Sequence, residues 1–233
     1  MEFNISSFNE CDNCNAVNNC ILFPFLKNNN CSEISDKYCK RVQYKNKELI
    51  IKQNLPINKV IFIRSGLVKV YSSTKYSEHI IKIVNSNTFI GLNNLYTKHS
   101  VYSAMTLEPT IACVIDSAFI KKIMCKNEDF NNYIIFLMVE NKIFLQQRLM
   151  DQFNKNTLGK VAELLLYFSE SIFYNDEFEL NLTRKELSQY AGITRENLTK
   201  VLTTYKNEGL ISLEGRKIKI KNKKKLYNLY INC

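Results

Sequence analysis

Three cysteines near the N-terminus, Cys11, Cys14 and Cys20, have a spacing suited to binding a metal. They form a C-x2-C-x5-C pattern in a polar segment, ECDNCNAVNNC, that has no hydrophobic periodicity. Thiolates are soft ligands, and such short spacers allow several sulfur atoms to converge on one centre. Three thiolates leave one coordination position for a distant residue. This stretch alone is compatible with three interpretations: an iron–sulfur cluster, a zinc knuckle or thiols that bind no metal. No histidine lies nearby to complete a Cys/His zinc site.

The compartment decides how the remaining cysteines are interpreted. No stretch approaches the ~20 apolar residues of a membrane span, and the N-terminus lacks a basic-then-apolar signal pattern. We therefore expect a cytoplasmic protein that does not interact with a membrane, in which disulfides are rare. Four cysteines receive no role from the sequence, although one of them, Cys31, is a spare candidate for a fourth metal ligand: Cys31, Cys39, Cys125 and Cys233.

Bulk composition favours a globular protein with an anionic partner. The 233 residues are 45% hydrophobic, which is enough for one large or two ordinary domains with real cores. The net charge is +10, which favours nucleic acid as a partner. The sequence has no P-loop, no dinucleotide-binding fingerprint and no recognisable nucleophile–base pair, so we do not expect an enzyme.

The stretch from Leu182 to Leu210 predicts a helix, a tight turn and a second helix. Thr183 is an N-cap candidate with Glu186 at capping-box spacing. Gly192 supplies the left-handed bend that ends the first helix, and Thr194 caps the second. Such a layout is typical of a DNA-reading helix-turn-helix, and the alternative is a helical hairpin that merely packs.

The sequence after the second helix predicts a wing. Residues 211–213 and 217–220 alternate in polarity around a Glu214-Gly215 turn, which indicates a small β-hairpin. From Arg216 to Lys225 seven of ten residues are basic. A charge run is usually a solvated face, but beside a helix-turn-helix it can follow DNA phosphates, and we assign that role to Lys217.

Short apolar runs between turn-forming residues predict a double-sheet jelly roll before the DNA-binding part. We expect strands at 48–51, 59–63, 67–71, 79–84, 104–107 and 111–115, preceded by a short helical stretch over 32–42. The expected fold class is therefore α+β, with an N-terminal double-stranded β-helix (a jelly roll or similar barrel), a long dimerisation helix and a C-terminal winged helix-turn-helix. The expected domains are a cysteine-rich loop (1–20), a jelly-roll sensor (21–126), the helix (127–155) and the DNA-binding domain (156–233).

The long helix is predicted from Asn127 to Phe153, where apolar residues recur every three or four positions without glycine or proline. Both of its faces are rather apolar, so we expect one face against the barrel and one against a twin helix in a homodimer. A further helix is expected over Lys160 to Tyr174. The residues assigned to the dimer interface are Ile134, Leu137, Met138, Asn141, Leu145 and Arg148.

The order of these elements resembles the cAMP-receptor/fumarate–nitrate-regulator (Crp/Fnr) superfamily of bacterial transcription factors over nearly the whole chain. Within it, the sequence looks like the fumarate–nitrate-regulator branch, an oxygen-sensing group that carries a [4Fe–4S] cluster. The signature of that branch is three N-terminal cysteines at C-x2-C-x5-C and a fourth on a late barrel strand. Cys11, Cys14 and Cys20 match the spacing, and Cys113 in LEPTIACVID matches the fourth position. The resemblance therefore implies that these four thiolates hold a [4Fe–4S] cluster.

The resemblance also implies a switch. An intact cluster favours dimerisation, and oxygen dismantles the cluster. A homodimer presents two recognition helices about one DNA turn apart (~34 Å) to palindromic double-stranded DNA. RNA polymerase is a further implied partner. The alternative is a zinc- or thiol-based redox-responsive regulator of the same family without an iron–sulfur cluster.

Residue types suggest how the second helix reads bases. Glu196 can accept a hydrogen bond from a cytosine amino group, Lys200 can reach guanine O6 and N7, and Arg195 can reach a second guanine or a phosphate. The resemblance supports Glu196, Thr199 and Lys200 as the base-reading set, because RENLTK sits where the family has its Glu-x-x-Ser/Gly-Arg pattern. The family usually has arginine at the position of Lys200. The lysine ammonium is a single point charge, whereas an arginine guanidinium could donate two parallel hydrogen bonds to guanine. The complete set of expected DNA-binding residues is Thr183, Thr194, Arg195, Glu196, Thr199, Lys200 and Lys217.

Cyclic nucleotide is not an expected ligand. Relatives that bind it resemble one another in a Gly-Glu pair and an Arg-Ser pair around the ligand phosphate and ribose. Here Gly91 is followed by Leu92, and no arginine occurs between Gly91 and Cys113, so a phosphate would lose its bidentate partner.

Overall fold

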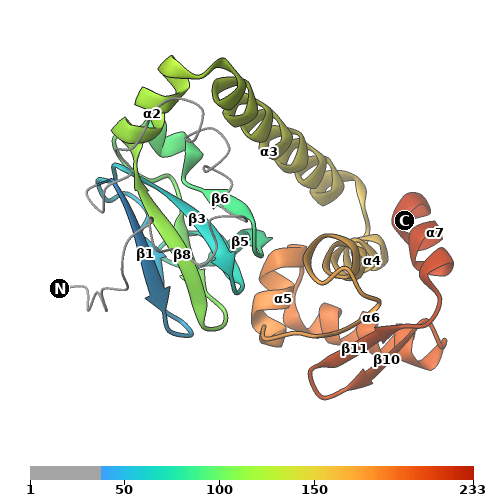
Figure 1. Cartoon of the computed structure of the whole chain (residues 1–233). Helices are drawn as coiled ribbons and strands as arrows, with labels where there is room; N and C mark the ends of the chain where they lie inside the picture. The colour runs from blue at the N-terminus through green and yellow to red at the C-terminus, as the bar shows by residue number, and fades with distance from the viewer. Residues whose placement is uncertain (1–37) are drawn as a thin grey trace. The chain divides into compact units, whose positions relative to one another are not determined.

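The computed structural model describes residues 38–233, which divide into two compact units (Figure 1). The first unit comprises residues 38–70 and 84–143, and the second comprises residues 71–83 and 144–233. The division falls inside the long helix, between Ile143 and Phe144. Cys11, Cys14, Cys20 and Cys31 lie outside the described residues.

The barrel strands form two four-stranded sheets, which confirms the predicted jelly-roll class. The first sheet has the order β1-β8-β3-β6 and the second the order β2-β7-β4-β5. The strands are β1 (Cys39–Tyr44), β2 (Leu49–Ile51), β3 (Lys59–Ser65), β4 (Val68–Ser73), β5 (Glu78–Val84), β6 (Thr88–Ile90), β7 (Ser103–Thr106) and β8 (Thr110–Asp116). A 3-10 turn, η3 (Leu92–Leu95), lies between β6 and β7.

Side chains of the first sheet alternate between two cores, as the period of two in a strand requires. On β8, Ala112 and Val114 face the core between the two sheets, together with Ile61 and Ile63 of β3. Cys113 and Ile115 belong instead to a core on the other face of the sheet. This second core, called here the outer core, contains Cys39, Val60, Phe62, Leu95, Cys113, Ile115, Phe119, Ile120, Ile123, Phe130 and Ile134.

The helical stretch expected over residues 32–42 is wrong for its described part, because Cys39–Tyr44 forms β1. Each residue of β1 pairs with β8, from Cys39 opposite Ile115 to Tyr44 opposite Thr110. The exposed Lys40 and Arg41 belong to an edge strand, where pairing with β8 outweighs local helix propensity.

Two helices follow the barrel. The first, α2 (Ser117–Lys126), begins with the Asp116 carboxylate accepting hydrogen bonds from the Ala118 and Phe119 amides. The second, α3 (Glu128–Asn154), is one uninterrupted helix and confirms the long helix predicted from the sequence (Figure 1). Of the helices among residues 38–233, none has both the length and the apolar content to cross a membrane.

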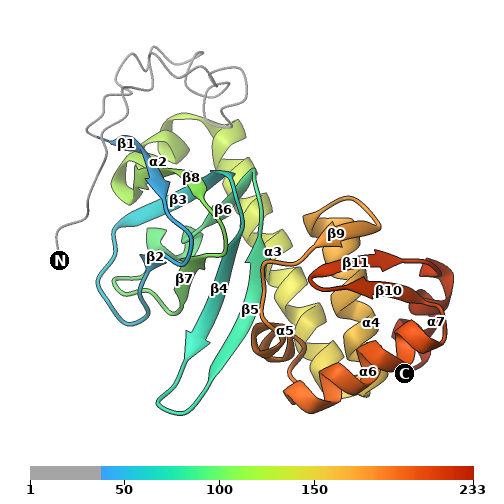
Figure 2. The ribbon, with the colours of Figure 1, turned by 90° about the horizontal axis from the view of Figure 1, so that it is seen from below.

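The winged helix-turn-helix is confirmed and has additional elements. Its helices are α4 (Thr157–Tyr167), α5 (Arg184–Ala191) and α6 (Arg195–Asn207), and a π-helical turn, η4 (Phe168–Ile172), follows α4. The expected helix over residues 160–174 therefore starts earlier, because Asn156 caps α4 through the amides of Leu158 and Gly159. The wing, β10 (Ile211–Glu214) and β11 (Lys217–Ile220), gains a third strand, β9 (Glu177–Glu179), beside β11 (Figure 2). A last helix, α7 (Lys223–Asn232), packs on α4.

Candidate functional site

Two capping threonines shape the helix-turn-helix. The Thr183 hydroxyl accepts a hydrogen bond from the Glu186 amide, and the Glu186 carboxylate accepts one from the Thr183 amide, which completes a capping box. Gly192 ends α5 with a φ of 65°, a value that favours glycine. Thr194 then caps α6 by accepting from the Asn197 amide. Both threonines therefore fix the helix starts, whatever further contact they make with DNA.

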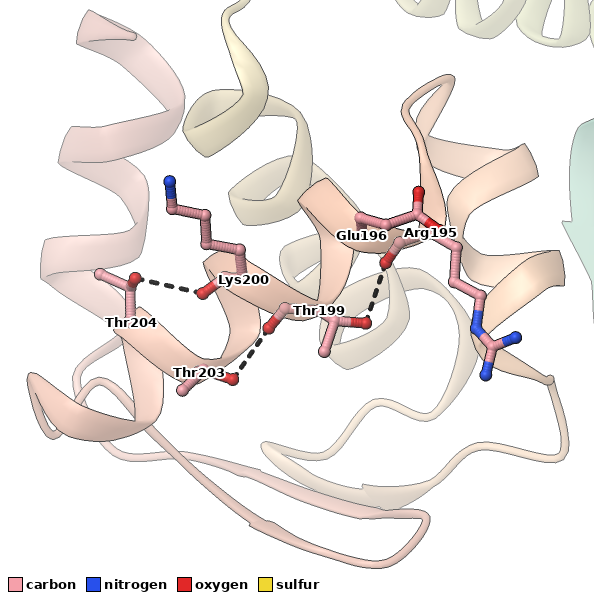
Figure 3. A pocket seen from close by; sticks show the side chains of 6 residues that line it. All are labelled: Arg195, Glu196, Thr199, Lys200, Thr203 and Thr204. Carbon is pink, nitrogen blue, oxygen red and sulfur yellow. Dashed lines mark hydrogen bonds between the residues drawn. The ribbon is translucent and has the colours of Figure 1, made fainter.

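The second helix presents a polar face. Six residues of α6 line an open depression of about 510 Å³, namely Arg195, Glu196, Thr199, Lys200, Thr203 and Thr204 (Figure 3). The opposite face of α6 buries Leu198, Val201, Leu202 and Tyr205 in the unit's core. This arrangement gathers four sequence-predicted residues, Arg195, Glu196, Thr199 and Lys200, on one surface and adds two threonines that the sequence analysis did not select.

The threonine hydroxyls have defined polarity. Thr199 donates to the Arg195 carbonyl oxygen over 2.8 Å, Thr203 to that of Thr199 over 2.9 Å, and Thr204 to that of Lys200 over 3.1 Å (Figure 3). A hydroxyl whose hydrogen is committed to the backbone can only accept from a partner. Thr199 thus offers an acceptor and a methyl group, which suit an amino group and a thymine methyl respectively.

The charged side chains of this face are available for a ligand. Arg195, Glu196 and Lys200 are exposed, and none of the three has an ion pair within residues 38–233. The surface therefore combines two cations, one carboxylate and threonine acceptors on the exposed face of one helix, a composition suited to the major groove of DNA.

Several lysines of the basic run after α6 form ion pairs within the chain. Lys217 and Lys219 form ion pairs of 2.7 and 2.9 Å with Glu177 on the neighbouring strand β9. These two ammonium groups lower the pKa of Glu177 to about 2. Glu177 was missed in the sequence because Glu-Phe-Glu is a weak strand signal. Lys217, predicted to contact phosphate, thus already has a carboxylate partner when DNA is absent.

The start of α7 uses further lysines of the run. Lys223 forms ion pairs with Glu170 at 3.1 Å and with Asp176 at 2.9 Å, and Lys225 pairs with Glu208 at 2.9 Å. Several charges that looked like a solvated phosphate-binding face therefore hold α7 to the rest of the unit.

Five of the eight exposed large apolar residues of α3 lie on a heptad stripe; the other three are Ile135, Leu145 and Leu149. Phe136, Val139, Ile143, Met150 and Phe153 are 47–78% exposed and recur at alternating spacings of three and four once Gln146 is included. This spacing is typical of the seam along which two helices pair in a coiled coil. We call these six residues the α3 seam.

The α3 seam differs from the interface residues selected from the sequence. Ile134 is fully buried in the outer core, and Leu137 and Met138 pack against that core. Arg148 is bound within its own unit, to Glu163 and the Tyr190 backbone. The structure thus places these four side chains on the face of α3 that packs on its own chain. Asn141 and Leu145 are exposed beside that face.

Cys113 is the single member of the predicted ligand set that the structure describes. It is 9% exposed in the outer core, opposite Arg41 on β1 and Phe62 on β3. Cys39 lies on the same face of β1, two residues from Arg41, so the two thiols are diagonal neighbours across adjacent strands. Within residues 38–233 no three His, Cys, Asp or Glu side chains are grouped so that they could hold a metal ion.

The Gly91 region is closed by a tyrosine. The Gly91 amide donates to the Tyr102 hydroxyl over 2.6 Å, and that hydroxyl donates to the Asn93 side chain over 3.2 Å. Burial raises the pKa of Tyr102 to about 12, so the phenol stays neutral. The Gly91 amide therefore has a hydrogen-bond acceptor within the sensor domain.

Comparison with known proteins agrees with this architecture. Residues 41–127 match the family model of the cyclic nucleotide-binding domain, and residues 159–229 match that of the Crp-like helix-turn-helix domain. The chain is 27% identical over 179 residues to the transcriptional activator protein anr of Pseudomonas aeruginosa, covering 74% of this chain and 73% of the relative. It is 24% identical over 218 residues to the fumarate nitrate reduction regulatory protein of Klebsiella oxytoca, covering 91% and 86%.

A solved structure shows the same fold. The structure of FixK2 from Bradyrhizobium japonicum aligns with a TM-score of 0.77 at 18% identity, covering 82% of this chain and 96% of that chain. The fold, the polar face of α6 and the named relatives indicate a DNA-binding transcriptional regulator. The chain belongs to the Crp/Fnr superfamily of such regulators.

Proposed function

We propose that this regulator is a homodimer that senses oxygen or redox state through a [4Fe–4S] cluster held by Cys11, Cys14, Cys20 and Cys113. The observation that carries the proposal is the position of Cys113. Its side chain shares the outer core with Phe130 and Ile134, which belong to the first two turns of α3. A metal centre bound to the Cys113 thiolate would therefore lie close to the start of the proposed dimerisation helix, where its loss could change the packing of that helix.

The donor set fits the cluster chemically. Four thiolates are the usual ligands of a [4Fe–4S] cluster, and the two short N-terminal spacers suit a wrapping loop. When bound, the cluster would supply an oxygen-sensitive link between that loop and β8. Cys113 lies in a mostly apolar environment, which would limit the access of water and oxidants to its sulfur.

Dimerisation through the α3 seam would connect the sensor to DNA binding. The exposed apolar side chains of the seam are unfavourable in water, and a second copy of the same helix would cover them. Gln146 in the middle of the seam would reduce the stability of this pairing, which suits a dimer that must dissociate.

The dimer would read palindromic DNA with Glu196, Thr199 and Lys200, while Arg195 and Lys217 contact phosphates or a flanking base. Thr183 and Thr194 would add backbone contacts from the two helix starts. RNA polymerase would be the further partner of the DNA-bound dimer.

The Tyr102 contact with Gly91 supports a sensor domain that does not respond to cyclic nucleotide.

The decisive experiment is an absorption spectrum of protein purified without oxygen, followed while air is admitted and while sedimentation reports the oligomeric state. We expect a broad band near ~400 nm that bleaches together with loss of the dimer. Cys20→Ser and Cys113→Ser should yield pale protein. Cys125→Ser is the matched control, because Cys125 is exposed on α2. Colourless anaerobic protein that takes up no iron on reconstitution would contradict the cluster.

A second candidate is a zinc- or thiol-based redox regulator. The shared face of Cys39 and Cys113 favours it, since two neighbouring thiols can undergo thiol chemistry without a metal. This alternative predicts colourless protein whose DNA affinity still changes on mild oxidation, and whose response is lost in Cys39→Ser.

A further inference from the structure

The last turns of α3 contact α5, the first helix of the helix-turn-helix, through an arginine and a glutamine, and the arginine makes the shorter hydrogen bond. Arg148 donates to the backbone carbonyl oxygen of Tyr190 over 2.7 Å. Its guanidinium carbon lies 3.7 Å from the centroid of the Tyr190 ring. Both residues belong to the same compact unit. A residue of the long helix thus holds both the backbone and the side chain of a residue near the end of α5.

The contact completes the end of α5. The last carbonyl groups of a helix have no partner within that helix, and a positive charge is favourable there. Arg148 supplies a donor to the Tyr190 carbonyl, and Gln152, one turn further along α3, supplies one to the Ala191 carbonyl over 3.3 Å. The C-terminus of α5 is therefore capped by two side chains of α3.

Gly192 allows this close approach. A Cβ atom at Gly192 would overlap the side-chain amide of Gln152. Glycine at this turn thus serves its left-handed conformation and also makes room for α3. The turn that sets the angle between α5 and α6 is consequently built against the long helix.

Arg148 itself is fixed by its surroundings. Its side chain is 11% exposed, and its Nη1 atom lies 3.2 and 3.4 Å from the two carboxylate oxygens of Glu163 on α4. The Tyr190 hydroxyl lies 3.5 Å from the same carboxylate. A planar guanidinium held by a carboxylate, a carbonyl and a ring has little freedom to reorient.

The opposite side of the same helical turns carries the α3 seam. Met150 and Phe153 are 53% and 78% exposed. In the heptad that contains them, Arg148 and Gln152 occupy positions that point away from the seam. These turns of α3 thus have one face for a partner helix and another that caps α5.

We propose that Arg148 is the positioning residue that transmits the geometry of the dimer to the two recognition helices. The proposal rests on the proposed dimeric reading of DNA. If α3 pairs along its seam, the Arg148 and Gln152 contacts fix the direction of each α5–α6 pair relative to the pairing axis. The spacing of the two recognition helices would then be set by the contacts of Arg148.

The test compares wild-type protein with Arg148→Met, Gln152→Ala and the control Lys126→Met, which removes an exposed cation from α2. The probe is a duplex that the wild-type protein selects from random DNA. Further probes have one half-site scrambled or the half-site spacing changed by one or two base pairs. Sedimentation reports dimerisation and circular dichroism reports folding.

We expect Arg148→Met to dimerise and to bind the single half-site as the wild type does. Its preference for the intact duplex should fall about tenfold, and the variant should tolerate altered spacing that the wild type rejects. In Gln152→Ala the preference for the intact duplex should fall about threefold. Lys126→Met should behave as the wild type.

Unchanged spacing sensitivity in Arg148→Met would overturn the proposal, and so would an equal loss on both probes, which would indicate only a local structural role. If Arg148→Met does not fold, the spacing response of Gln152→Ala decides. Failure of the wild type to prefer the two-site duplex would instead contradict the proposed dimeric function.

Discussion

The hydroxyl of Tyr102 receives a 2.6 Å hydrogen bond from the backbone amide of Gly91. A side chain of the sensor domain thereby satisfies the Gly91 amide, and its own hydroxyl hydrogen goes to the Asn93 side chain. The match of residues 41–127 to the cyclic nucleotide-binding domain describes the fold of this part of the chain.

We expect Tyr102→Phe to lower the free energy of unfolding by about 1–3 kcal/mol, because the Gly91 amide would lose its acceptor. Urea denaturation measures the effect. Tyr76→Phe, at an 88% exposed tyrosine, is the control and should change stability by less than ~0.5 kcal/mol. Millimolar cAMP should leave the melting temperature of the wild type unchanged. A clear increase would contradict the expectation that the sensor domain does not bind cyclic nucleotide.

Glu163 should give stability a pH dependence. Burial raises its pKa from 4.5 to about 6, despite the nearby Arg148. The folded state then binds the proton more tightly than the unfolded state, so the contribution of Glu163 to stability is fully present below pH 4.5 and is lost as pH rises towards 6. Glu163→Gln should remove this slope in urea titrations between those pH values.

Glu177→Gln is the matched control for that slope. The folded-state pKa of Glu177 is about 2, so its contribution is lost only as pH falls below the ordinary value of 4.5. This variant should keep the slope between pH 4.5 and 6. A slope that persists in Glu163→Gln would assign it to another group.

The same Glu177→Gln variant should bind DNA more tightly. Glu177 is paired with Lys217 and Lys219 and would compete with DNA phosphates for them. Removing its charge should raise affinity for specific and random duplexes alike, by about two- to fivefold, and steepen the salt dependence. Lys217→Ala should weaken both in parallel. Filter binding at several salt concentrations tests this, and an effect confined to one sequence would be inconsistent with a phosphate contact.

Base reading by α6 should be separable from these electrostatic effects. We expect Glu196→Ala to lose about 1–3 kcal/mol of discrimination at one base pair while affinity for random DNA is kept. Competition with single-base operator variants measures this. Equal losses on specific and random DNA would exclude Glu196 as a base-reading residue.

Two isoleucines of α3 distinguish its two faces. Ile143, 54% exposed in the seam, should give a folded monomer when replaced by glutamate, as measured by sedimentation. Ile134, fully buried, should cost about 2–5 kcal/mol of stability when replaced by alanine. A dimeric Ile143→Glu protein would show that the partner uses another face.

Much of the fold follows from local patterns in the sequence. The capping pair Thr183 and Glu186, the turn glycine Gly192 and the alternation in the wing predicted elements that the structure confirms. These signals act over a few residues and need no tertiary information. Strand β1 and strand β9 were not predicted, because their pairing partners β8 and β11 decide their conformation.

The sequence by itself determined the helix-turn-helix, the barrel class, the cysteine spacing and the chemical types on α6, since each is a local pattern of residues. Tertiary structure alone decided which face of α3 is free, because both faces are apolar and only packing of Ile134 into the outer core distinguishes them. It also decided that Glu177 pairs with Lys217 and that Arg148 caps α5. Those contacts join residues 40 and more positions apart, and no sequence period encodes them.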